Sequence, residues 1–338
     1  MNSILLKKLP LYYTLGIILL TATLAYITTN YFDGKEKNKI LELSESKNSC
    51  TYNIERMEGY PFIKPILFVD DLCEGDALAG MKKEITSLIE NYKNYQGVIS
   101  ASVYIKEFNH NEWMAVNEEE KYEPGSLFKV PILIAYLKMN EEHPGVLDKE
   151  LLFNQSFNID KVVAYKSNSI QLGKAYKVRD LLKYMIVYSD NNATALLNNN
   201  LKSEVLLKLF KDLELELPNV SAKQYFFTTK QYSLFMRAIF NASYLSIDDS
   251  EYAAELLSKC QFNDGIRKGV PASIKMAHKF GESGTPSEKQ LHESAIVYLE
   301  NKPYLLTVMT KGKDNASLSK LISEISALVY KDQSNKSS

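Results

Sequence analysis

Hydrophobic and polar residues follow two different periods early in the chain. Between 77 and 95 (ALAGMKKEITSLIENYKNY) the apolar residues recur at three- and four-residue steps, which predicts an amphipathic helix. Residues 97–107 (GVISASVYIKE) and 112–117 (EWMAVN) are rich in β-branched and aromatic residues and enclose an Asn-His-Asn turn. The pattern therefore predicts a helix followed by a β-hairpin.

The middle of the chain, roughly 126–265, has mainly helical spacing. Its apolar periodic segments begin with the run after Ser126 and continue through VRDLLKYMIVY, NATALLNNNLKSEVLLKLFKDL and TTKQYSLFMRAIFNA. The end of the chain returns to strands and closes with a helix, at 272–282, 293–300, 304–312 and 316–330. Two strands before the helical region and three after it predict a helical subdomain inserted into a sheet.

The short connections between successive strands require antiparallel pairing, because parallel neighbours need a crossover. We therefore expect an α/β (α+β) fold with a five-stranded, mainly antiparallel sheet flanked by helices, in which the two ends of the domain meet. The domain is predicted to span 77–332, with the all-helical subdomain at about 126–265. Its length is ample for one large buried core.

A long apolar segment precedes this domain. Residues 9–29 carry no charge and follow Lys7 and Lys8, and as a helix they reach roughly 31 Å, about one hydrocarbon core. They predict an uncleaved transmembrane anchor with residues 1–8 in the cytoplasm and the domain outside the cytoplasmic membrane. A signal peptide cut after Ala25 and a buried helix are the alternatives.

Residues 30–76 connect the anchor to the domain. The part from 30 to 48 is mostly charged and polar, which indicates a spacer. Among the three cysteines, Cys50 and Cys73 flank a short module that a disulfide could close outside the cell, whereas Cys260 stands apart. A net charge of -1, with lysines interleaved among acidic residues, excludes the footprint of a nucleic-acid binder. The sequence has no His/Cys cluster that would predict a metal site.

Ser126 and Lys129 head the apolar run EPGSLFKVPILIAYL. In the first turn of a helix they share one face, so that the amine can reach the hydroxyl and activate it as a nucleophile. The spacing alone is weak, because Ser44 with Lys47 and Ser317 with Lys320 repeat it. A helix cap is the simpler interpretation of Ser126, and the residues downstream must decide.

Two further motifs follow in order. Ser189, Asp190 and Asn191 lie between two helical segments, where they also suit a helix cap. Lys279 and Gly281 lie on a predicted strand, where a glycine permits close backbone approach. Each motif has an ordinary structural interpretation, but the ordered set is far more specific.

Together SLFK, SDN and KFG resemble the S-x-x-K, S-D-N and K-T-G signatures of the class A β-lactamase and penicillin-binding serine hydrolases. The resemblance implies a β-lactamase/DD-peptidase-like fold in which Ser126 is acylated and Lys129 accepts its proton. It also implies that Ser189, aided by Lys279, relays a proton to the leaving nitrogen, and that Asn191 binds Lys129 and the substrate amide. No cofactor is implied.

The resemblance also implies a set of substrate-binding residues. The backbone N–H groups of Ser126 and Glu282 would form an oxyanion hole beside Gly281. Tyr165 is expected to wall the pocket. Arg267 is expected either to bind a substrate carboxylate or to form a surface ion pair.

The chain departs from class A β-lactamases in two places. It lacks the E-x-x-L-N motif whose glutamate hydrolyses the acyl-enzyme, and Glu214 and Glu216 suit the solvent face of a strand or short helix. Phe280 replaces a hydroxyl residue that helps to bind the substrate carboxylate, while His292 is expected to be a satisfied structural histidine. Slow deacylation is therefore expected.

The sequence thus predicts a membrane-anchored, extracytoplasmic serine acyl hydrolase. Its expected substrate is a β-lactam or a peptidoglycan peptide of the D-Ala-D-Ala type. Two alternatives stay open: a non-catalytic protein that binds cell-wall peptide on the same fold, and a true β-lactamase whose deacylating water is activated by Lys129 or another group.

Overall fold

The computed structural model describes residues 51–157, 165, 168–217 and 225–335, together with 23, 26 and 28. The chain divides into two compact units, Met1–Thr51 and Tyr52–Ser338. Nearly all of the expected anchor at 9–29 and of the spacer lies outside the described residues. Within the described part, no helix is long and apolar enough to cross a membrane.

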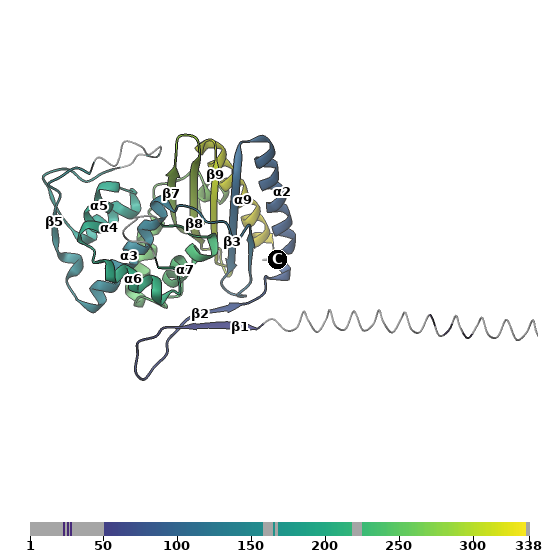
Figure 1. Ribbon diagram of the computed structural model, residues 1–338, viewed down its shortest axis with the longest axis horizontal. Helices are drawn as coiled ribbons and strands as arrows, with labels where there is room; N and C mark the ends of the chain where they lie inside the picture. The colour runs from purple at the N-terminus through teal and green to yellow at the C-terminus, as the bar shows by residue number, and fades with distance from the viewer. Residues whose placement is uncertain are drawn as a thin grey trace, which may run out of the picture. The chain divides into compact units, whose positions relative to one another are not determined.

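A five-stranded antiparallel sheet forms the centre of the second unit (Figure 1). Its strand order is β4-β3-β9-β8-β7, with β3 at Val98–Glu107, β4 at Trp113–Val116, β7 at Met276–Gly284, β8 at Lys289–Val297 and β9 at Tyr304–Gly312. The neighbours β3 and β9 come from the two ends of the domain and pair over their whole length. The expected sheet and the meeting of the chain ends are confirmed.

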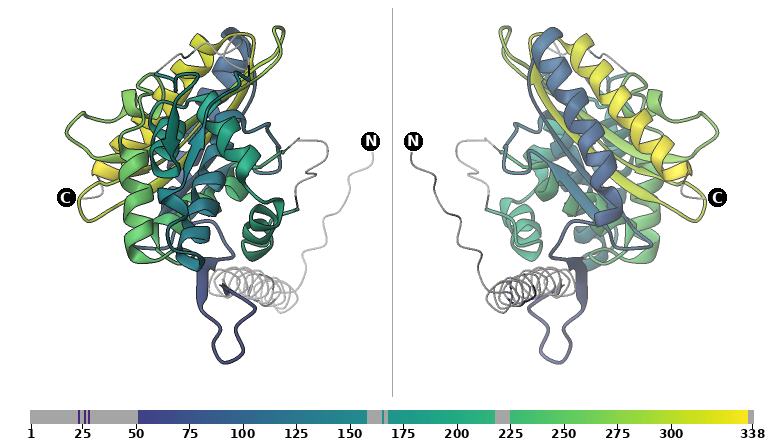
Figure 2. Two further views of the ribbon diagram at one scale, coloured as in Figure 1. Left: turned by 90° about the vertical axis from the view of Figure 1, so that its left-hand side faces the viewer. Right: turned by 90° about the vertical axis from the view of Figure 1, so that its right-hand side faces the viewer.

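Helices α2 (Ala79–Tyr95) and α9 (Asn315–Asn335) lie side by side on one face of this sheet (Figure 2). Each buries an apolar stripe, represented by Ile85 and Ile89 on α2 and by Ile322 and Ile325 on α9. The three- and four-residue spacing of these side chains is what the amphipathic pattern predicts. The stripes and the facing side chains of the sheet form one of the two hydrophobic cores.

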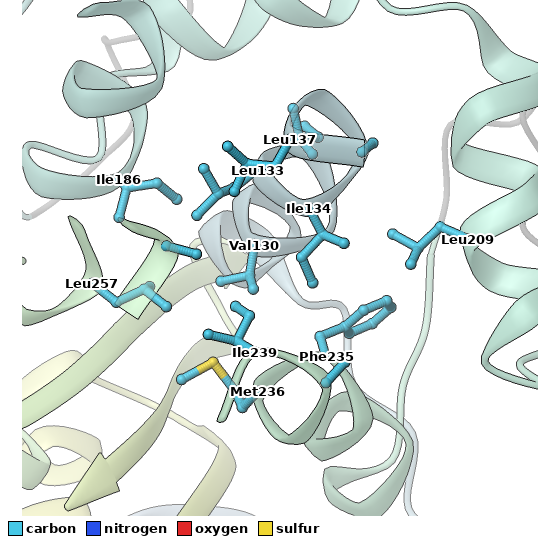
Figure 3. Packing of buried hydrophobic residues seen from close by; sticks show 14 of the residues in the cluster. Val130, Leu133, Ile134, Leu137, Ile186, Leu209, Phe235, Met236, Ile239 and Leu257 are labelled. Carbon is cyan, nitrogen blue, oxygen red and sulfur yellow. The ribbon is translucent and has the colours of Figure 1, made fainter. Parts of the chain in front are cut away.

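The second core lies around α3 (Lys129–Glu142) on the opposite side of the sheet (Figure 3). Every residue from Lys129 to Leu137 is buried, and Val130, Leu133 and Ile134 contact the surrounding helices. A helix that is apolar on all faces must be enclosed by protein. It packs against α4 (Val178–Val187), α6 (Ser203–Asp212), α7 (Thr229–Phe240) and α8 (Ile247–Ser258). Tyr136 also donates a hydrogen bond to Leu197 O of α5 (Asn191–Asn200).

The middle region differs from the expectation in two respects. It is not all helical, because β5 (Glu150–Leu152) and β6 (Ala175–Lys177) pair as a separate two-stranded sheet. The apolar pattern of 192–213 also covers two helices, since the backbone of Leu201 and Lys202 between α5 and α6 is extended. Short 3-10 turns complete the region, η2 at Gly125–Phe128, η3 at Val146–Asp148 and η4 at Ile266–Gly269.

The compact unit begins before the predicted domain boundary. Strands β1 (Tyr52–Arg56) and β2 (Ile66–Asp71) form a hairpin, followed by the short turn η1 at Asp76–Leu78. The Asp70 carboxylate accepts hydrogen bonds from Lys106 Nζ at 2.8 Å and Arg237 Nη2 at 2.7 Å, which ties the hairpin to the sheet and to α7. The part of the expected lead-in from Tyr52 onward therefore folds with the domain.

Two of the three cysteines lie within the described residues. Cys73 is disulfide-bonded, and Cys260 is a free, buried thiol. Cys50, the partner that the sequence suggests for Cys73, lies outside the described residues.

Candidate active site

The turn that carries Ser126 is pressed against strand β7. Ser126 lies in η2, directly before α3, and Gly125 has a positive φ of 51°. A Cβ atom added at Gly125 would lie 2.2 Å from Glu282 O, and one at Gly281 would lie 2.2 Å from Pro124 O. Both glycines are therefore required for the backbones of η2 and β7 to approach this closely.

Lys129 reaches from the first turn of α3 to the Ser-Asp-Asn loop. Its Nζ donates hydrogen bonds to Ser189 O at 2.6 Å, Ser189 Oγ at 3.1 Å and Asn191 Oδ1 at 2.8 Å. The side chain is only 3% exposed, so these bonds form away from bulk water and hold the amine in place. Ser126 and Lys129 line the same cavity.

The Ser-Asp-Asn loop acts both as a helix cap and as part of the site. Asp190 is the N-cap of α5 and accepts a hydrogen bond from Asn192 N at 2.9 Å. It also accepts bonds from Ser169 Oγ and Ile170 N, both at 2.8 Å. Ser189 has a φ of 53°, a strained conformation for a non-glycine residue. The buried Asp190 thus anchors the loop, while the strained turn directs Ser189 toward both lysines.

Lys279 contacts the same hydroxyl from the sheet. Its Nζ donates to Ser189 Oγ at 2.9 Å and to Phe280 O at 3.0 Å. The Phe280 ring packs on Phe262, with centroids 4.3 Å apart, and Lys279 Nζ lies 4.1 Å from the Phe280 centroid. The sheet therefore presents a fully buried cation to Ser189, and the ring of Phe280 packs against that lysine.

Burial lowers the pKa of Lys279 from 10.5 to about 8, although the nearby Cys260 and Glu293 act in the opposite direction. The cation is the protonated form, so it is present below this pH and is lost above it. If catalysis uses the charge beside Ser189, the acylation rate constant should fall as the pH rises through about 8. In Lys279→Arg this fall should move to higher pH, because a guanidinium stays charged. The acylation rate constant should be measured as a function of pH for both proteins. A fall at the same pH in the variant and the wild type would contradict this role.

An open cavity of about 730 Å³ lies beside Ser126. Four predicted residues line it: Ser126, Lys129, Asn191 and Glu282. The rest of its lining comes from η2, α3, α5 and the β7–β8 hairpin, with Phe157 and Tyr225, and comprises Gly125, Phe128, Ile132, Thr194, Ala195, Asn198, Asn199, Ser283, Gly284 and Lys289. A concave site with apolar walls and a few convergent polar groups is the form expected of a small-molecule or peptide site.

Two predicted residues lie elsewhere. The Tyr165 ring packs edge-on against Phe262 and Phe280, with centroids 4.9 and 5.8 Å away, and does not line this cavity. The Arg267 guanidinium donates hydrogen bonds to the carbonyls of Ile274 at 2.8 Å, Val270 at 2.9 Å and Pro271. It therefore fixes the loop that leads into β7 and is not directed to the cavity.

His292 is a satisfied structural residue, as expected. Its Nδ1 accepts from Thr310 N at 3.1 Å, so Nε2 carries the proton and donates to Glu123 O at 3.0 Å. Burial lowers the pKa of His292 to about 3, which keeps the ring neutral. Because Glu123 lies just before η2, this bond helps to position the turn that carries Ser126.

The segment after α6 contains the two acidic residues considered above. Glu214 and Glu216 are exposed, and Glu216 pairs with Lys121 at 2.8 Å. They lie in irregular backbone, so the expected solvent exposure is confirmed while the expected strand or helix is wrong. Residues 218–224, which follow, are outside the described residues.

Solved structures share the fold at low sequence identity, among them the following three. PBP-A is 20% identical with a TM-score of 0.63, covering 76% of this chain and 97% of its own. A mutant of PBP-A in an acyl-enzyme complex with penicillin G is 19% identical with a TM-score of 0.64, covering 78% and 100%. A β-lactamase from Chitinophaga pinensis is 18% identical with a TM-score of 0.64, covering 75% and 98%.

No match was found among curated proteins. The model of the β-lactamase enzyme family, however, matches residues 80–333, well over half of the chain. This match spans η2 with Ser126, and it also spans α3, the Ser-Asp-Asn loop and β7, whose Lys129 and Lys279 side chains meet at Ser189. The chain therefore belongs to the β-lactamase enzyme family.

Proposed function

We propose that the chain is an active-site serine hydrolase that forms an acyl-enzyme on Ser126 with β-lactams or with peptidoglycan peptides of the D-Ala-D-Ala type. The observation that carries this proposal is the convergence of Lys129 and Lys279 on Ser189 Oγ, at 3.1 and 2.9 Å. A binding protein without turnover has no use for two buried amines that share one hydroxyl. The arrangement suits the transfer of a proton across the site.

Acylation begins when Ser126 Oγ attacks the substrate carbonyl carbon and forms the new C–O bond. Lys129 accepts the hydroxyl proton as the neutral amine, which has two N–H groups and so keeps at most two of its three hydrogen bonds to Ser189 and Asn191 until it is protonated. The carbonyl oxygen becomes negative, and in this proposal the backbone N–H groups of Ser126 and Glu282 stabilise it. The close packing of Gly125 against Glu282 holds these two peptide groups at a fixed separation, which is the preorganisation that such a site needs.

The C–N bond breaks when the leaving nitrogen receives a proton. Ser189 Oγ accepts hydrogen bonds from Lys129 and Lys279, so its own hydroxyl hydrogen is directed away from both lysines. Ser189 can pass that proton to the leaving nitrogen and recover one from Lys129. The buried charge of Lys279 favours the developing negative charge on Ser189 Oγ during this transfer.

Deacylation is proposed to be slower than acylation. Deacylation needs a positioned water and a base that takes a proton from that water. Among the described residues that line the cavity, Glu282 is the one carboxylate that could act as this base. The carboxylate of Glu282 accepts a hydrogen bond from Asn315 Nδ2 at 3.0 Å. A mutant of PBP-A has been seen in an acyl-enzyme complex with penicillin G, which supports acylation by a β-lactam on this fold.

Pre-steady-state kinetics test this order of rates. Mixing the full-length protein with a chromogenic cephalosporin should give a burst of about one product equivalent per enzyme, followed by a slow linear phase. A linear course with rapid turnover would contradict slow deacylation. Absence of both burst and turnover, with the ligand bound reversibly, would instead favour a binding protein.

We also propose that the chain is held at the cytoplasmic membrane through residues 9–29, with the domain outside. The uncharged run supports this proposal, and so does the hairpin β1–β2, whose Tyr52, Tyr60, Phe62 and Ile63 side chains are exposed. Aromatic side chains favour the membrane–water interface. Alkaline extraction of native membranes should leave the full-length protein in the pellet, and its release into the supernatant would overturn the proposal.

A further inference from the structure

The direction of a substrate along β7 follows from the contacts of Lys279. This lysine bonds to Ser189, the proposed proton donor to the leaving nitrogen, so the leaving group lies toward the Lys279 end of the strand. Glu282, three residues on, contributes to the proposed oxyanion hole. The acyl portion must then extend past Glu282 toward Ser283 and Gly284, which line the open cavity.

A cation stands at this acyl end. Lys289 is the first residue of β8, is opposite Gly284 in the strand register and lines the cavity. The other lining cation, Lys129, is engaged by Ser189 and Asn191. Within the described residues, the Lys289 ammonium has no hydrogen-bond or ion-pair partner, so its charge is not neutralised by a neighbouring carboxylate.

The remaining walls of the cavity suit an acyl group of peptide character. Helix α5 contributes the side-chain amides of Asn191, Asn198 and Asn199, which offer donors and acceptors. Phe128 and Tyr225 contribute apolar aromatic surface, and their ring centroids are 4.0 Å apart. An acyl group with amide and apolar parts would thus be accommodated, and Lys289 would select among such groups by charge.

We propose that Lys289 makes the acyl side of the cavity a subsite for acyl groups that carry a carboxylate. This inference rests on the proposed function, because it takes the orientation of the substrate from the Ser126 mechanism. It names the donor class: peptides or β-lactams with an anionic acyl substituent. A charge-assisted hydrogen bond from Lys289 should increase affinity for such a ligand about tenfold over an uncharged analogue.

Benzylpenicillin and α-carboxybenzylpenicillin are suitable probes, because they differ by one carboxylate on the acyl side chain. Dissociation constants should be measured first with full-length Ser126→Ala protein, in which no covalent step occurs. The carboxylated penicillin should bind about tenfold more tightly, and Lys289→Met should remove most of this preference. Lys289→Arg should restore it, while Lys275→Met, an exposed lysine outside the cavity lining, should leave it unchanged.

Equal dissociation constants for the two penicillins, no measurable binding of either, or an equal loss for both in Lys289→Met would overturn the subsite. A different result would contradict the proposed function. If the charge preference is present but the Ser126-containing protein forms no adduct with either penicillin, the subsite stands and the acyl-enzyme mechanism is wrong. Circular dichroism of each variant verifies that the fold is retained.

Discussion

Replacing Ser126 by alanine should abolish the acyl-enzyme and lower turnover by about three orders of magnitude or more. The substitution removes the oxygen that forms the new bond to the carbonyl carbon, and no other described hydroxyl lies in the same turn against β7. Ser126 is only half-buried, and alanine fills nearly the same volume, so the fold should be retained. Turnover of a chromogenic cephalosporin and the melting temperature measure the two effects separately.

Ser317 provides a matched control, since it also precedes a lysine by three residues. Its hydroxyl bonds to Asp314 Oδ2 at 3.0 Å near the start of α9, so Ser317→Ala should leave turnover unchanged. Full turnover in Ser126→Ala, or an equal loss in both variants, would show that the nucleophile lies elsewhere.

Lys129→Met should slow acylation by about 10²- to 10⁴-fold, the range typical for the loss of a general base. The thioether can fill the space of the lysine stem but cannot accept the proton of Ser126. The variant also leaves Ser189 O and Asn191 Oδ1 without the donor that they share, which should cost about 1 to 3 kcal/mol of stability. Stopped-flow acylation below the melting transition separates the chemical loss from this destabilisation.

Lys138→Met is the control on the same helix. Lys138 bonds to Glu141 at 2.8 Å and to Tyr244 O at 3.0 Å, so its loss should affect stability and leave acylation within about twofold. A comparable fall in acylation in both variants would mean that Lys129 acts through the packing of α3. Acylation at the wild-type rate in Lys129→Met would assign the base to another group.

Much of the fold is predictable because its elements have strong local periodicity. The strand expected at 304–312 coincides with β9, and α2 falls within the expected 77–95. Helix α9 covers the expected 316–330 and extends beyond it at both ends. The break between α5 and α6 was not predicted, since Leu201 and Lys202 continue an apolar pattern and carry no glycine or proline. The hairpin at 52–71 was also not predicted. Its inward contacts, such as Asp70 with Arg237, join residues far apart in sequence.

Some features of the candidate site were also predictable from the sequence, and others were not. The motifs around Ser126, Ser189 and Lys279 were evident as an ordered set, but their convergence depends on tertiary contacts across 60 and 90 positions. Tyr165 was expected in the cavity, but its ring packs on Phe262. Arg267 was expected either to bind a substrate carboxylate or to form a surface ion pair, but it bonds to backbone carbonyls of the loop around η4.

Lys289 carried no sequence signal, because an isolated lysine near a turn resembles any solvated residue. Only the pairing of β8 with β7 reveals its position beside Gly284. Strand register, and not local pattern, therefore determines which cation faces the cavity.

The most direct test of the central claim is intact-mass spectrometry of the full-length protein after incubation with benzylpenicillin, followed over time and by peptide mapping. We predict a mass increase of one penicillin per chain that forms within the burst, decays slowly and maps to the peptide containing Ser126. An adduct on any other residue, or product formation without a trapped adduct, would contradict the account.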